Sequence, residues 1–231
     1  MDSKDKVVHQ MIQILRQECR EHPYRFSIVF FIIYACGFFG IEALDLPVIW
    51  HISCPLDSLI PFVKYAIIPY CTWFLWLLVG TLHLTIKEDG ETRWRVMAPM
   101  YSGLLLILLF CLLVPNGIEL RPEEIPGNDI FAVLVRMIEG ADNPNNVCPS
   151  MHVYSTIFLD LGVQRSKNLK TPILKPAARI LDILICASTM FLKQHSIVDV
   201  AAAFLFAVLM DRAAERLIGH QEVKEAAHSG I

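Results

Sequence analysis

The chain has 231 residues, 55% of them hydrophobic, and a formal net charge of −3. Its mean hydropathy of +0.48 lies well above that of an ordinary soluble domain. The nearly balanced charge excludes the strongly basic surface that binds nucleic acid. We therefore expect a single-domain integral membrane protein that has no nucleic-acid partner.

The first 25 residues are polar and charged and contain no apolar segment typical of a secretory signal. Insertion is therefore expected to depend on internal apolar segments. Within this stretch, apolar residues recur at helical spacing beside basic ones, at Val8, Met11, Ile12 and Leu15. The pattern predicts an amphipathic N-terminal segment over residues 1–25, lying on the cytoplasmic membrane surface.

Six apolar stretches follow, and a helix of about 20 apolar residues crosses the hydrocarbon core of a bilayer. Such segments must be helical because lipid cannot satisfy free backbone polar groups. The predicted spans are Phe26–Leu44, Ile60–Leu82, Met97–Val114, Pro149–Val163, Pro176–Leu192 and Ser196–Leu217. The expected fold class is all-α, a polytopic bundle of about six transmembrane helices over residues 26–218 with a cytoplasmic tail over residues 219–231.

The basic residues predict the orientation of these spans. Sixteen of the twenty Lys and Arg residues fall in the N-terminal segment, in or beside the loops after the second and fourth spans, and near the C-terminus, where they are Arg212, Arg216 and Lys224. With six spans these regions share one side, and positively charged loops favour the cytoplasm. Both termini are therefore expected in the cytoplasm, whereas five or seven spans would split the basic loops between the two sides.

The long loop between the third and fourth spans contains a second amphipathic stripe. Its apolar residues are Ile130, Val133, Leu134, Met137 and Ile138. The spacing predicts a helix that lies on the membrane surface or packs over the bundle.

The seven cysteines form no CxxC pair, and most lie inside apolar runs, which favours small buried residues over disulfides or zinc ligands. No dense carboxylate cluster suggests another metal. We therefore expect neither a metal nor another cofactor.

Polar residues gather near the non-cytoplasmic ends of the predicted spans. Ser150 and His152 follow Pro149 at the start of the fourth span, and proline suits the first turn of a helix. A helix N-terminus attracts anions through its free N–H groups and partial positive charge. A histidine beside such an anion site can protonate a leaving group.

A second group lies at the start of the sixth span. His195 and Asp199 are four residues apart and share one helix face. A carboxylate beside an imidazole fixes its tautomer and leaves the other ring nitrogen free to attack. Lys193 is a candidate cation for the same site, although a lysine at the membrane boundary is also typical of a side chain that reaches lipid headgroups.

Arg121, in the loop after the third span, offers a planar fork of donors that suits phosphate oxygens. Two histidines, one carboxylate and one or two cations on one side of the membrane fit phosphoryl transfer through a phosphohistidine. His195 would attack, His152 would protonate the leaving alcohol, and water would then release phosphate.

The chain resembles the type 2 phosphatidic acid phosphatase (PAP2) superfamily of membrane lipid phosphatases and phosphotransferases. That family shows three motifs, K-x6-R-P, P-S-G-H and S-R-x5-H-x3-D. The matching residues are Arg121-Pro122, then Pro149-Ser150-Met151-His152, then Ser188, His195 and Asp199. The resemblance implies that His195 is the nucleophile, Asp199 its orienting partner and His152 the acid and base. It also implies that Arg121, Ser150 and Ser188 hold phosphate.

Two basic residues of the family pattern are replaced, by Val114 in the first motif and by Thr189 in the third. Lys193 is the candidate substitute. Together with Met151 in place of glycine, this pattern is similar to a divergent branch that includes inositol phosphorylceramide synthase-like proteins.

The leading hypothesis is therefore a phosphatase that acts on a lipid phosphate or diphosphate at the non-cytoplasmic face. Phosphatidic acid, phosphatidylglycerol phosphate and polyprenyl diphosphate are candidate substrates. One alternative is a phosphotransferase that passes a phospho-headgroup to an alcohol other than water. A second is a non-catalytic scaffold or transporter, although no inverted repeat with broken helices is evident.

Overall fold

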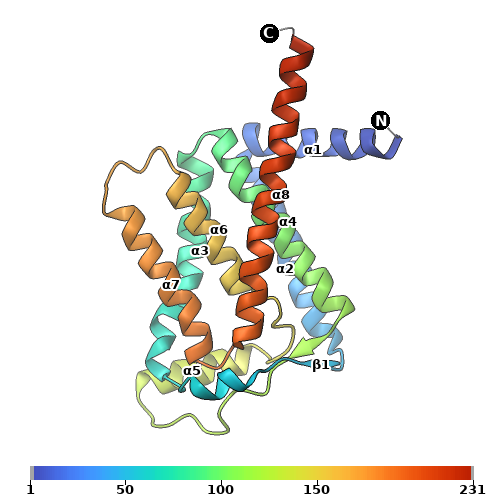
Figure 1. The fold of residues 1–231 in the computed structure, drawn as a ribbon. Helices are drawn as coiled ribbons and strands as arrows, with labels where there is room; N and C mark the ends of the chain where they lie inside the picture. The colour runs from blue at the N-terminus through green and yellow to red at the C-terminus, as the bar shows by residue number, and fades with distance from the viewer. Residues whose placement is uncertain (1–2, 230–231) are drawn as a thin grey trace.

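The computed structural model describes the backbone of residues 3–229 and the side chains of residues 7–217 except residue 9. This part of the chain is mostly helical (Figure 1). Its α-helices are α1 Ser3–Glu21, α2 Pro23–Leu44, α3 Ile67–Lys87, α4 Gly90–Leu113, α5 Ile130–Ala141, α6 Met151–Arg165, α7 Leu174–Phe191 and α8 Ile197–Ser229. The 3-10 helices η1 Pro55–Leu59 and η2 Lys64–Ala66 precede α3, and strand β1 Trp50–His51 pairs in parallel with β2 Asn116–Gly117.

Helix α6 lies at the centre of the bundle and packs against α3, α4, α7 and α8. Helix α2 packs against α4 and α3, while α1 lies across one end of the bundle against α4 and α2 (Figure 1). Helix α5 and the two short strands lie at the opposite end. The segments that precede α6 and α8 reach this same end, where the candidate site residues lie.

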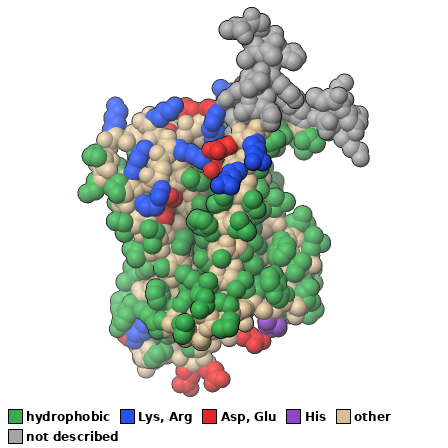
Figure 2. Space-filling model, in the orientation of Figure 1, with side chains coloured by type: hydrophobic (Ala, Val, Ile, Leu, Met, Phe, Trp, Pro, Cys, Tyr) green, Lys and Arg blue, Asp and Glu red, His purple; other side chains and the backbone are tan. Residues whose placement is uncertain are grey.

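Charged and apolar side chains are distributed unevenly between the ends and the middle of the bundle. On the face drawn in Figure 2, apolar side chains cover the middle of the bundle, and most Lys and Arg side chains gather near the end that carries α1. Acidic side chains are seen at both ends. Many large apolar side chains of α2 and α3 are exposed, among them Ile32, Phe39, Leu75 and Leu78. This distribution suits an apolar surrounding for the middle of the bundle.

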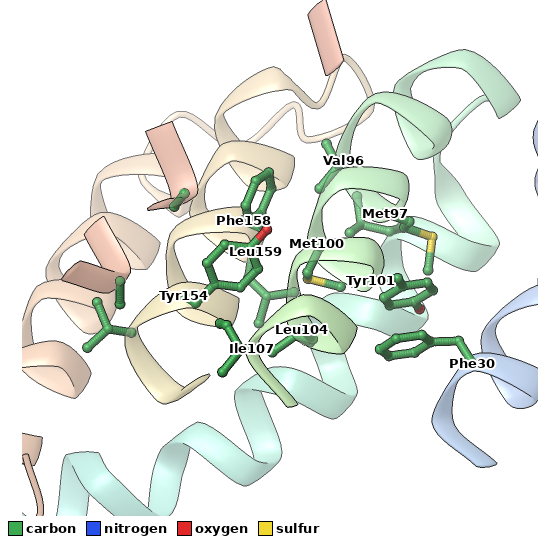
Figure 3. Close-up of a cluster of buried hydrophobic side chains, with 14 of the residues drawn as sticks. Phe30, Val96, Met97, Met100, Tyr101, Leu104, Ile107, Tyr154, Phe158 and Leu159 are labelled. Carbon is green, nitrogen blue, oxygen red and sulfur yellow. The ribbon is translucent and has the colours of Figure 1, made fainter. Parts of the chain in front are cut away.

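The largest buried cluster joins α4 and α6 and is closed by Phe30 of α2 (Figure 3). The Tyr154 hydroxyl donates to the Pro99 carbonyl at 2.7 Å, so this buried hydroxyl is paired. Gly103 gives the ring its space, because a Cβ at this position would lie 1.8 Å from the Tyr154 oxygen. The close α4–α6 contact therefore fixes the helix that carries His152.

The predicted helical fold class is confirmed, but the predicted six membrane spans are not. Within the described residues, three helical segments are long and apolar enough to cross a membrane: Pro23–Leu44, Lys64–Lys87 and Gly90–Leu113. Helix α6 has only 15 residues, and its central position surrounds it with protein.

Several predicted helix ends are wrong for identifiable reasons. Helix α3 begins at Ile67 and not at Ile60, which precedes a proline and is extended (φ −84°, ψ 117°). Helix α4 begins seven residues before Met97, because the Asp89 carboxylate accepts hydrogen bonds from the first turn. Helix α8 continues to Ser229, so most of the predicted tail has helical backbone; residues 1–2 and 230–231 lie outside the described residues.

Both amphipathic stretches are helical, as predicted. In α1 the side chains of Val8, Met11 and Leu15 are exposed, while Ile12 packs toward α4. In α5 the fully buried residues are Ala132 and Val135, which lie beside the predicted stripe. Val135 packs against the start of α3, so α5 covers the end of the bundle.

Candidate functional site

The loop that joins α7 to α8, residues 192–196, places His195 at the covered end of the bundle. The N–H groups of Gln194 and His195 both donate to the Thr189 carbonyl, at 2.9 and 3.1 Å. Lys193 takes up the left-handed conformation (φ 56°), which reverses the chain between the two helices. His195 is therefore fixed by the C-terminal end of α7 as well as by α8.

His195 and Asp199 are in contact as predicted, but His195 lies in the loop before α8 and the two do not share a helix face. The His195 Nδ1 atom lies 3.0 Å from Asp199 Oδ2, and the Asp199 side chain is fully buried. The second ring nitrogen of His195, Nε2, lies 3.4 Å from Nδ1 of His152. The carboxylate therefore holds the Nδ1–H tautomer and leaves Nε2 directed at the other histidine.

His152 lies in the first turn of α6 against aromatic rings of α3. Its ring centroid is 4.1 Å from that of Trp73 and 4.9 Å from that of Tyr70. The Trp73 indole N–H donates to Ser155 Oγ at 3.0 Å, which fixes the tryptophan against α6. These contacts restrict the His152 ring to one orientation, with its Nδ1 atom facing His195.

Ser150 is the N-cap of α6, so Pro149 precedes the helix and does not occupy its predicted place in the first turn. The Ser150 hydroxyl accepts a hydrogen bond from the Val153 N–H at 3.3 Å, and the Ser150 N–H donates to the Asp199 carbonyl at 3.3 Å. Ser150 thus connects the start of α6 to α8. Its predicted role in phosphate binding would use the same helix N-terminus.

Arg121 reaches the site through one intermediate side chain. Its Nη2 donates to Gln194 Oε1 at 2.6 Å, and its Nη1 donates to the Asp142 carbonyl at 2.8 Å. The Asp142 carboxylate lies 3.8 Å away, and Glu139 contacts Gln194. Burial raises the pKa of both carboxyl groups above their ordinary values, partly offset by the Arg121 charge. The guanidinium is therefore held against Gln194, the residue before His195, and lies among two carboxyl groups.

The remaining predicted phosphate ligands have other partners in this structure. The Ser188 hydroxyl donates to the Ile185 carbonyl at 2.6 Å, within α7. The Lys193 ammonium donates to the Asp57 carbonyl at 2.6 Å. Thr189, at the position where the PAP2 motif has arginine, donates to the Cys186 carbonyl at 2.8 Å. The structure thus groups His195, Asp199 and His152 directly, and Arg121 through Gln194.

Sequence reasoning missed Asp57 and Gln194. Asp57, in η1, accepts hydrogen bonds from the Ser196 hydroxyl at 2.7 Å and from the Ile197 N–H at 2.9 Å. Burial acts to raise the pKa of Asp57, but hydrogen bonds from Ile197, Ser196 and Cys54 outweigh it and place the pKa below its ordinary value. The available signal was a carboxylate in an otherwise apolar stretch between two predicted spans.

Comparison with protein-family models, with curated proteins and with solved structures gives no match to this chain.

Proposed function

We propose that the chain is a membrane lipid phosphatase that works through a phosphohistidine, with no metal or other cofactor. The observation that carries the proposal is the row Asp199–His195–His152, in which one histidine is oriented by a buried carboxylate and faces a second histidine. A nucleophile, its orienting group and a proton donor are the parts that covalent phosphoryl transfer needs.

In the first step His195 Nε2 attacks the phosphorus of a lipid phosphate. The N–P bond forms as the bond from phosphorus to the lipid oxygen breaks, and protonated His152 gives its proton to that oxygen. Asp199 stabilises the positive charge on the His195 ring. In the second step water attacks phosphorus, His152 takes the proton of the water, and phosphate leaves as the N–P bond breaks.

We further propose six spans, with both termini in the cytoplasm and the site at the non-cytoplasmic end. The gathering of basic side chains near the α1 end supports this orientation. Helices α6, α7 and α8 pack alongside the three apolar helices, which supports their crossing the same layer.

Transfer of a phospho-headgroup to an alcohol is the second candidate function. Its support is the charge around Arg121, whose guanidinium is accompanied by Asp142 and Glu139. Two family cations are replaced by Val114 and Thr189. A site with this little positive charge suits the single charge of a phosphodiester better than the double charge of a phosphomonoester. The acceptor alcohol would then replace water in the second step.

The test is phosphate release from a panel of lipid phosphates in detergent, with a chelator present. We expect release by the wild type and its loss in His195→Ala, together with a ³²P-labelled phosphoenzyme that accumulates only when His195 is present. His51→Ala is the matched control, because this histidine lies at the same end of the molecule with its side chain 55% exposed. It is expected to keep wild-type activity.

The same panel is then run with phosphodiester lipids and a diacylglycerol or ceramide acceptor. Headgroup transfer without phosphate release would favour the second candidate. A folded wild type that neither releases phosphate nor transfers a headgroup would contradict both and support a non-catalytic scaffold or transporter.

A further inference from the structure

Asp57 caps helix α8 from a distant part of the chain. It lies in η1, between α2 and α3, and is only 3% exposed. Its Oδ1 accepts from the Ile197 N–H at 2.9 Å, and its Oδ2 accepts from the Ser196 hydroxyl at 2.7 Å. The Cys54 N–H donates to the same Oδ2 at 2.7 Å. A carboxylate at a helix N-terminus is favoured by the free N–H groups and the partial positive charge there.

The residues that the Asp57 carboxylate holds come directly after the candidate nucleophile. Ser196 and Ile197 follow His195 directly, and the Ser196 hydroxyl also accepts a hydrogen bond from the Val198 N–H at 3.1 Å. The carboxylate and the first turn of α8 therefore form one connected network. Any shift of that turn moves His195 and Asp199 together.

The α7–α8 loop is attached to the η1–η2 region at two further points. The Lys193 ammonium donates to the Asp57 backbone carbonyl at 2.6 Å, and the Val63 N–H donates to the Phe191 carbonyl at 2.9 Å. Contacts before and after His195 thus end on the same outer segment. The chain that carries the imidazole is fixed at both of its ends, whereas His152 is fixed separately by α3.

We propose that Asp57 is a positioning residue for phosphoryl transfer, whose carboxylate holds the start of α8 so that His195 Nε2 faces His152. The proposal rests on the proposed function. Its energetic reason is that attack requires the reacting atoms in near-contact geometry, and a displacement of about 1 Å can cost about 100-fold in rate. In this proposal Asp57 acts through Ser196 and Ile197 and does not contact the substrate.

The experiment compares Asp57→Ala and Asp57→Asn with Asp129→Ala in the detergent assay. Asp129 is a matched control, because it caps α5 at the same end of the bundle through N–H groups of Phe131 and Ala132, at 3.1 Å each, and pairs with Lys64. Loss of either cap removes similar contacts. Only Asp57 is connected to His195.

We expect Asp57→Ala to lower kcat about 10- to 100-fold with KM changed less than about threefold. Asp57→Asn is expected to recover part of the rate, because its amide oxygen can still accept from the start of α8. Asp129→Ala should keep kcat within about threefold of the wild type. An equal loss of kcat in Asp57→Ala and Asp129→Ala would overturn the proposal.

A second measurement does not depend on the reaction. In protein labelled with ¹⁵N-histidine, the ring resonances of His195 and His152 are compared, with assignments from His195→Ala and His152→Ala. Asp57→Ala should shift both, whereas Asp129→Ala should leave them unchanged. If the wild type is inactive on every lipid, the proposed function fails while this result still supports the positioning of His195. Unchanged ring resonances in folded Asp57→Ala would refute that positioning.

Discussion

Arg121 is connected to His195 through a single side chain, Gln194. The guanidinium bridges the Gln194 amide oxygen and the Asp142 carbonyl, and Gln194 in turn contacts Glu139. Such a bridge needs the planar fork of donors that only arginine has. We therefore regard the geometry of Arg121, and not its charge alone, as the property that the site uses.

We expect Arg121→Lys and Arg121→Gln to lower kcat/KM by about 10- to 100-fold, because charge-assisted hydrogen bonds contribute about 1.5–3 kcal/mol. Inhibition by inorganic phosphate should weaken in parallel. Arg121→Lys should retain little more activity than Arg121→Gln, because an ammonium cannot bridge the Gln194 amide oxygen and the Asp142 carbonyl. Steady-state kinetics with phosphate as inhibitor provides the measurement.

Arg136→Lys is the control for this pair of variants. Arg136 is an exposed arginine of α5 that donates to the Gly127 carbonyl at 3.1 Å. Its replacement should change neither kcat/KM nor phosphate inhibition. If Arg121→Lys also behaves like the wild type, the guanidinium geometry is irrelevant and only a positive charge is needed.

At the residue level the sequence predicted what local spacing determines. The four-residue interval between His195 and Asp199 predicted their hydrogen bond, although His195 lies in the loop before α8 and not on a shared helix face. The contact from Asp57 to Ser196 and Ile197 joins residues about 140 positions apart, and no local pattern encodes it. The role of Lys193 in phosphate binding stays a prediction, and its 2.6 Å contact with the Asp57 carbonyl adds a second role.

At the level of elements the sequence predicted each long helix but not every end. Apolar content located the helices, because a run of apolar residues is conspicuous whatever its neighbours. The start of α4 depends on the Asp89 cap, and the start of α3 depends on the extended residue before Pro61, so hydropathy placed both incorrectly. The short helix α6 was the weakest prediction, although it lies at the centre of the bundle.

The contact between α4 and α6 depends on the absence of a side chain at Gly103. A Cβ there would lie 1.8 Å from the oxygen and 2.3 Å from the Cζ of Tyr154. We expect Gly103→Ala to destabilise the protein by about 1–3 kcal/mol, because the buried ring cannot move without disturbing its neighbours. Thermal unfolding in detergent measures the change, and phosphate release should fall with it because α6 carries His152.

Two further variants make the steric cause testable. Tyr154→Phe removes the oxygen that the new Cβ meets first, so Gly103→Ala combined with Tyr154→Phe should lose less stability than the sum of the single changes. Gly40→Ala is the control, since a Cβ at Gly40 meets nothing within 4 Å. It should leave stability unchanged or raise it slightly through helix propensity. Strict additivity would exclude the clash as the cause.

For the whole molecule, the uneven distribution of basic side chains is the observation that supports the proposed orientation in the membrane. Basic side chains gather at the α1 end, and the candidate site lies at the other end beside α5 (Figures 1 and 2). Loops rich in Lys and Arg are retained on the cytoplasmic side, whereas Asp and Glu have little influence on orientation. The proposed substrate would then be a lipid of the non-cytoplasmic leaflet. A direct measurement of the orientation tests this expectation.

Two exposed charged residues at opposite ends of the bundle provide that test. Glu124 lies between β2 and α5, and Lys167 lies between α6 and α7. In intact cells a membrane-impermeant maleimide should label Glu124→Cys above the wild-type background and should leave Lys167→Cys unlabelled until the membrane is permeabilised. The reverse pattern would place the site in the cytoplasm. Labelling of both residues in intact cells would mean that the segment between them crosses the membrane an even number of times, which contradicts the six-span arrangement.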